Sequence, residues 1–152
     1  MLGADLCSGS LFGLLMASLT YLHQRETMLP HLTYADAVHA ALTDANLVPD
    51  TLTVNAPVDT EDLTVLLQWN DMAIRWSSEA GWRHESAHSS GPLPLDRFAD
   101  PAAIITTAAL LQQGQQPVTH HKRWAAAQIL DRAISDWTIA LSDDHAQAAP
   151  RT

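Results

Sequence analysis

Residues 63–82 read LTVLLQWNDMAIRWSSEAGW, and this stretch decides the fold. Apolar side chains alternate with others on both sides of Asn70-Asp71, which is a typical two-residue turn. A hairpin closed at this turn pairs three apolar residues of each strand, namely Val65 with Trp76, Leu67 with Ile74, and Trp69 with Met72. All six side chains then point to one side of the sheet, and this agreement predicts the register.

Further strands extend this hairpin in both directions. Residues 51–54 are rich in β-forming side chains, and a turn at residues 79–81 leads to a strand at 82–85. Residues 86–94 contain serine, glycine and proline, and we expect them to form a loop. The sequence therefore predicts an antiparallel meander of three or four strands with one strongly apolar face.

Helical patterns bracket the meander. Residues 34–45 have apolar side chains at helical spacing, with Thr33 as the expected N-cap and Asn46 as the expected left-handed end. Residues 103–113 form a second core helix, which Asp100 and Pro101 start and Gly114 stops. The fold class is therefore α+β: an antiparallel meander packed against helices, with an N-terminal helix and a long C-terminal helix.

The long C-terminal helix is expected over residues 119–141. Its apolar residues are spaced 3, 4, 3 and 4 apart, at Ala127, Leu130, Ile134, Trp137 and Leu141. This heptad-like seam suits packing against the chain's own N-terminal helix or against a partner's helix. We predict an N-terminal amphipathic extension at 1–27, a single domain at 28–141 and a flexible acidic, alanine-rich tail at 142–152.

The N-terminal extension contains the longest apolar stretch, LFGLLMASLTYL at 11–22. A transmembrane helix needs about 20 apolar residues, and a secretory signal needs Lys or Arg before the stretch and small residues after it. We therefore expect an amphipathic helix, with a degenerate signal as the alternative, and a cytoplasmic location. Met28 is a second candidate start of the protein.

The charge and the cysteine content argue against several kinds of partner and of structural site. The 152 residues include 17 acidic and 8 basic side chains, which gives a net charge of −9. A surface this acidic repels phosphates, so neither nucleic acid nor an anionic membrane is an expected partner. Cys7 is the only cysteine, which excludes an intramolecular disulfide and a zinc site made of cysteines.

Residues His84-Glu85-Ser86-Ala87-His88 match the H-E-x-x-H pattern of zinc hydrolases. In such a site His84 and His88 are metal ligands on one helix face and Glu85 is the general base. Gly91 continues the metzincin pattern, but Pro94 stands where the third ligand is required. Because residues 81–92 look like a strand entering a loop, we expect no metal cofactor, with zinc as the alternative.

Two other clusters have both a structural and a functional interpretation. Trp69, Trp76 and Trp82, together with Met72, could form the floor of a ligand pocket, or they could fill the gap between sheet and helices. The basic run at residues 120–123, HHKR, starts the long helix, where it could bind a phosphate or remain solvated.

The segment Ile74-Arg75-Trp76 followed by Gly81-Trp82 resembles a family of small actinobacterial domains common in Streptomyces. That family has no established function and carries a W-x(n)-G-W signature, and the resemblance covers about residues 31–112. It supports the helix, meander, helix order. The same order is loosely similar to type III secretion chaperones, which are small, acidic and dimeric.

These observations favour a non-catalytic acidic binding or interaction module, which is a homodimer and acts through a protein partner or a small ligand. Self-association is expected through the helix at 119–141. The first alternative is a zinc-dependent hydrolase that uses residues 84–88. The second is a small natural-product enzyme or ligand-binding protein with a tryptophan-lined pocket.

Overall fold

The computed structural model describes residues 29–56 and 62–148. The expected helix at 11–22, Cys7 and the candidate start at Met28 lie outside these residues. The described elements are, in order, α2 (Leu32–Asp44), β1 (Thr51–Asn55), β2 (Thr64–Gln68), β3 (Met72–Ser77), β4 (Gly81–Ser86), β5 (Ser90–Pro92), α3 (Pro101–Gln112) and α4 (Ala127–Ala148).

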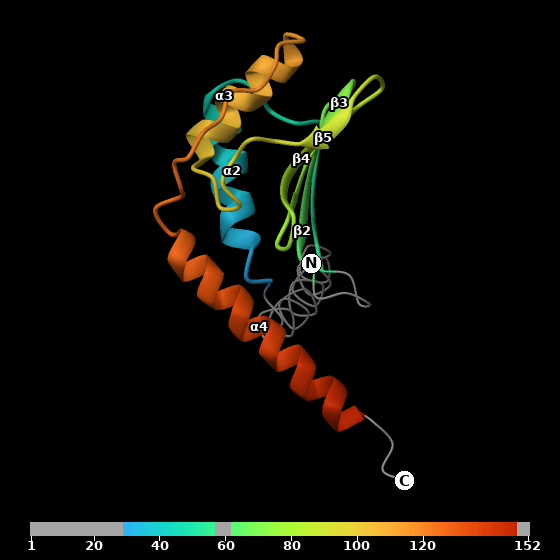
Figure 1. Cartoon of the computed structure of the whole chain (residues 1–152), viewed down its shortest axis with the longest axis vertical. Coiled ribbons are helices and arrows are strands. Elements are labelled where there is room, and N and C mark those ends of the chain that lie inside the picture. Colours follow the sequence, from blue (N-terminus) through green and yellow to red (C-terminus); the bar gives the residue numbers. More distant parts are fainter. Residues whose placement is uncertain (1–28, 57–61, 149–152) are drawn as a thin grey trace, which may run out of the picture.

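The five strands form one antiparallel sheet in the order β1-β2-β3-β4-β5, and α2 and α3 lie on one side of it (Figure 1). The predicted α+β class is therefore confirmed. The expected number of three or four strands was too low, because β5 consists of Ser90, Gly91 and Pro92. These residues have low strand propensity, and only their pairing with β4 makes them a strand.

The predicted register of the central hairpin is confirmed. Val65 pairs with Trp76 and Leu67 with Ile74, and the Trp69 N–H donates to the Met72 carbonyl over 2.8 Å. Four of these side chains, at Val65, Leu67, Ile74 and Trp76, are at most 1% exposed. The alternation of apolar residues determined this face because a shift of one residue would turn every side chain outward.

The core lies between this face and the helices. Tyr34, Val38 and Leu42 of α2 and Ile104 of α3 are buried against the sheet. The Tyr34 hydroxyl donates to the Ala99 carbonyl over 2.6 Å, and burial raises the pKa of this phenol. This bond ties α2 to the segment that leads into α3.

The helix ends follow the sequence signals in part. Asp100 accepts from the Ala102 N–H over 2.9 Å at the start of α3, as predicted, and Gly114 (φ 70°) and Asn46 (φ 60°) adopt the left-handed conformation after their helices. The prediction of Thr33 as an N-cap was wrong. Helix α2 already begins at Leu32 after His31, so Thr33 lies inside its first turn.

The C-terminal helix was expected to start at residue 119, and it starts at Ala127. The preceding residues pair in extended form with residues 94–99: His120 N donates to the Pro94 carbonyl over 3.0 Å, and Trp124 N donates to the Phe98 carbonyl over 2.7 Å. These long-range backbone bonds replace the first two turns of the expected helix. The helix also continues to Ala148, beyond the expected end at Leu141.

The apolar seam of α4 contacts the chain's own core at its beginning. Ala127 and Leu130 are 3% and 4% exposed, and Ile134 and Trp137 are partly buried against the core. The remainder of α4 extends away from the sheet (Figure 1). Among the described helices, none combines the length and apolarity that a membrane span requires.

Candidate functional site

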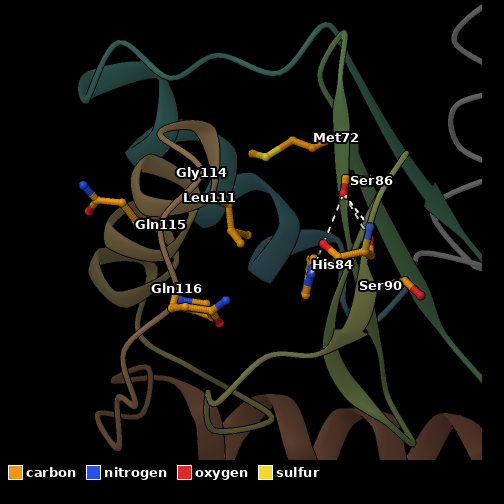
Figure 2. Close-up of a pocket in the computed structure, with 10 residues that line it drawn as sticks. Met72, His84, Ser86, Ser90, Leu111, Gly114, Gln115 and Gln116 are labelled. Atoms are coloured by element: carbon orange, nitrogen blue, oxygen red, sulfur yellow. Dashed lines mark hydrogen bonds between the residues drawn. The ribbon is translucent and has the colours of Figure 1, made fainter.

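A hollow of about 280 Å³ lies between the sheet and the end of α3. Figure 2 shows Met72 and His84 on the side of the sheet, and Leu111 and Gln116 on the side of α3 and the loop that follows it. The lining residues are mostly polar but uncharged, and they are Met72, His84, Ser86, Ser89, Ser90, Leu111, Gly114, Gln115, Gln116 and Pro117. The sheet thus supplies an imidazole and hydroxyls, and the loop after α3 supplies amides.

The turn between β4 and β5 holds the serines of this wall in place. The Ser86 N–H donates to the Ser89 carbonyl over 2.8 Å, and the Ser89 N–H donates to the Ser86 hydroxyl oxygen over 3.2 Å. The Ser86 hydroxyl in turn donates to the Ser89 carbonyl over 3.1 Å. Because these bonds close a short local turn, the hydroxyls are positioned without help from elsewhere in the fold.

Among the described residues that line the hollow, His84 is the one with a titratable side chain. Its Nε2 lies 3.4 Å from the Ser89 hydroxyl oxygen, and its Nδ1 is buried without a hydrogen-bond partner in the described structure. A buried polar atom without a partner is unfavourable, and such atoms are few in native proteins. In the described structure, one ring nitrogen of His84 is therefore left without a hydrogen bond.

None of the described residues that line the hollow is a carboxylate, although the chain has 17 acidic residues. Glu85 follows His84 directly in β4, and adjacent side chains of a strand point to opposite faces of the sheet. The polar groups of the wall are serine hydroxyls, glutamine amides and the imidazole. Such groups can exchange hydrogen bonds with neutral or anionic molecules, but they cannot form an ion pair with a cation.

The H-E-x-x-H segment does not have the geometry that zinc hydrolases use. His84 and Glu85 are in strand β4, and His88 lies in the bend between β4 and β5. The zinc interpretation needs residues 82–90 on a helix, so that both histidines share one face. Within residues 29–56 and 62–148, no three His, Cys, Asp or Glu side chains are grouped to hold a metal ion.

The tryptophans that were candidates for a pocket floor are packed into the structure. Trp76 is 0% and Trp82 is 2% exposed, and Trp76 donates its indole N–H to the Arg97 carbonyl over 2.7 Å. Trp69 is partly buried and donates to the Leu47 carbonyl over 3.1 Å. Of the four residues proposed as a ligand site, only Met72 lines the hollow, because the large indoles fill the space between sheet and helices.

The basic run 120–123 also lies in a different setting from the expected one. It is an extended segment before α4 and forms no helix N-terminus. Arg123 pairs with Asp96 over 3.2 Å, and Lys122 approaches Asp100 at 3.9 Å. The phosphate interpretation required the amide groups of a first helical turn, and these residues do not provide them.

Most residues of the hollow were not among the sequence candidates. Ser86, Ser89 and Ser90 lie at the connection between β4 and β5, and Gln115 and Gln116 lie in the loop after α3. No spacing rule connects the turn at 86–90 with the loop at 114–117. Two signals in the sequence pointed to this wall: Met72, as part of a candidate ligand pocket with the tryptophans, and His84, as a candidate metal ligand.

The fold is that of a small α+β domain, with a mostly polar hollow between its sheet and the end of α3. Comparisons of the chain with protein-family models, with curated proteins and with solved structures give no significant match. The resemblance to the small actinobacterial domains therefore stays a prediction.

Proposed function

We propose that this protein is a non-catalytic binding module whose hollow takes a small neutral or anionic molecule rich in hydrogen-bonding groups. The observation that carries the proposal is the composition of the wall: His84, Ser86, Ser89 and Gln116 bring an imidazole, two hydroxyls and an amide to one space, and none of the described residues that line it is a carboxylate. Binding pockets typically combine apolar walls with a few polar groups that fix the orientation of a ligand. Met72, Leu111 and Pro117 are the apolar part of this one.

The arrangement of His84 favours binding over catalysis. A histidine that activates a serine needs a third group at its other ring nitrogen to fix the tautomer and orientation. His84 lies 3.4 Å from the Ser89 hydroxyl, which is long for a hydrogen bond, and its Nδ1 has no such partner in the described structure. The zinc-hydrolase alternative lacks support from geometry because its residues are in a strand and a bend.

Three probes of nearly the same shape test the proposed ligand class: benzamide, benzoate and benzamidine, which are neutral, anionic and cationic. In a titration followed by two-dimensional NMR, we expect benzamide and benzoate to shift the amide signals of Ser86 and Ser90, because the wall can hydrogen-bond both. Benzamidine should leave these signals unchanged, since none of the described wall residues is a carboxylate that could pair with it. His84→Ala and Gln116→Ala should weaken the binding of benzamide at least about tenfold, which equals 1.4 kcal/mol.

Gln112→Ala is the matched control for this titration. Gln112 is an exposed residue at the end of α3 that does not line the hollow. It should leave the binding of benzamide unchanged. Equal weakening by Gln112→Ala and Gln116→Ala, or preferential binding of benzamidine, would contradict the proposed site.

We propose self-association through α4 as a second function, and exposed apolar residues of this helix support it. Ile129 and Ile139 are 74% and 60% exposed. Large apolar side chains on a projecting helix favour contact with another copy of that helix.

Sedimentation velocity at micromolar protein concentration measures the oligomeric state and so tests this second proposal. We expect a dimer for the natural chain and a shift to monomer for Ile139→Lys, because a lysine in an apolar contact must be desolvated. Gln128→Lys adds the same charge to an exposed position of α4 and should leave the dimer intact. A monomer for the natural chain at this concentration would exclude self-association through α4.

A further inference from the structure

A row of five residues crosses the face of the sheet that points away from α2 and α3. Successive cross-strand pairs define this arginine row as Thr53, Leu66, Arg75, Arg83 and Pro92. The neighbours of these residues along the strands, such as Leu67, Ile74 and Trp82, are buried in the core, so the row faces outward. The helices α2 and α3 lie on the opposite side (Figure 1).

The centre of the row places two like charges next to each other. Arg75 and Arg83 are directly opposite on adjacent strands, and both are exposed. Like charges in this relation destabilise a sheet. In a chain with more than twice as many acidic as basic residues, this juxtaposition is unexpected.

Neither arginine has a carboxylate partner within the described residues. The ion pairs among the described residues have Arg97, Lys122 and Arg123 as their cations. Glu85 lies two residues beyond Arg83 on the same strand, and it forms no ion pair there with either arginine. Within the part of the chain that the structure describes, the donors of the two guanidinium groups are therefore not engaged by a carboxylate.

The dimensions and composition of the row indicate what the acceptor is. Five strands spaced ~4.8 Å apart make the row ~19 Å long, which matches about six residues of an extended peptide. Leu66 and Pro92 flank the arginines and offer apolar contacts on either side. Guanidinium groups bind carboxylates in a bidentate manner, whereas a long polyanion such as nucleic acid is repelled by the net charge of −9.

We propose that the arginine row binds a short acidic segment of a partner protein, with carboxylates on Arg75 and Arg83 and apolar side chains against Leu66 and Pro92. This site lies on the opposite face of the sheet from the hollow and does not depend on the ligand proposed there. The partner segment removes the repulsion between the two arginines, which have no carboxylate partner among residues 29–56 and 62–148.

The test uses the full chain and a fluorescent six-residue peptide of alternating glutamate and leucine, with binding followed by anisotropy. The double variant Arg75→Gln/Arg83→Gln should bind the peptide at least about tenfold more weakly, because two charge-assisted contacts are lost. The matched double variant Lys122→Gln/Arg132→Gln removes the same charge from exposed positions outside the row and should bind like the natural chain. A peptide with glutamine in place of glutamate should not bind.

Each other outcome overturns the proposal. No binding to the natural chain excludes the site, and equal weakening by the two double variants indicates non-specific attraction. Displacement of the peptide by equimolar inorganic phosphate indicates a site for small anions and excludes a protein segment. Unfolding by urea checks that the folded state is kept: Arg75→Gln/Arg83→Gln should be at least as stable as the natural chain, since it relieves a like-charge pair.

Discussion

Trp76→Ala is expected to lower the free energy of unfolding by about 3–5 kcal/mol, the range for removal of a fully buried large aromatic side chain. Trp76 is 0% exposed and lies at the centre of an aromatic cluster. Its ring centroid is 5.8 Å from that of His31, 5.7 Å from that of Tyr34 and 6.2 Å from that of Phe98. The stability of a whole domain is about 5–15 kcal/mol, so this single change should bring the protein close to unfolding at room temperature.

Two further variants make this prediction specific. Trp76→Phe keeps an aromatic ring in the cluster but removes the indole N–H, so the Arg97 carbonyl loses its donor at 2.7 Å. We expect an intermediate loss of about 1–3 kcal/mol, which is the cost of leaving a buried acceptor without a partner. Val118→Ala, at a position outside α4 that is 58% exposed, should change the stability by less than about 0.5 kcal/mol.

Unfolding in urea, followed by circular dichroism, gives the free energy of unfolding of all three variants. A loss of less than about 1 kcal/mol for Trp76→Ala would mean that this indole is not at the centre of the core. It would also remove the argument that the tryptophans fill the space proposed from the sequence as a pocket.

The free energy of unfolding should fall as the pH falls below about 6.5, and His31 should contribute a large share of this loss. His31 is 0% exposed, and burial lowers its pKa from 6.5, while backbone hydrogen bonds at Thr64 and Asn55 raise it less. Its Nε2 is 3.1 Å from the Thr64 carbonyl, so Nε2 carries the proton of the neutral ring. Its Nδ1 is buried and has no hydrogen-bond partner in the described structure.

The sign follows from the proton numbers of the two states. Because the pKa of His31 is lower in the folded than in the unfolded state, the unfolded state takes up a proton first as the pH falls through 6.5. Stability is therefore lost from about 6.5 downward and stops falling once the pH is below the folded pKa. One such proton contributes at most about 1.4 kcal/mol per pH unit.

His31→Phe isolates this contribution, because phenylalanine can stack on Trp76 as the imidazole does and does not titrate. Urea unfolding of both proteins at pH 7.5, 6.5 and 5.5 gives the two slopes. We expect the natural chain to lose more stability between pH 6.5 and 5.5 than His31→Phe loses. Equal slopes would mean that His31 has the same pKa in both states, whatever the absolute stability of the variant.

Parts of the fold were predictable because their signals are local. The alternation at residues 63–76, closed by Asn70-Asp71, predicted the register of β2 and β3, and Asp100 and Gly114 predicted the ends of α3. The candidate site was predictable to a much smaller extent. The sequence suggested Met72 for a ligand pocket with the tryptophans and His84 for a metal site, and the structure brings these two residues together on the wall of the hollow.

The sequence by itself determined the α+β class, the central hairpin and the two core helices, because side-chain periodicity and turn residues act over a few positions. Only the tertiary structure decided where α4 begins, since residues 120–124 exchange helical bonds for bonds to residues 94–99. It alone also decided the hollow, which joins β3, the β4–β5 turn and the loop at 114–117. It likewise placed Arg83 opposite Arg75 and turned that pair outward. Such arrangements depend on contacts between residues far apart in the chain, and no local pattern records those contacts.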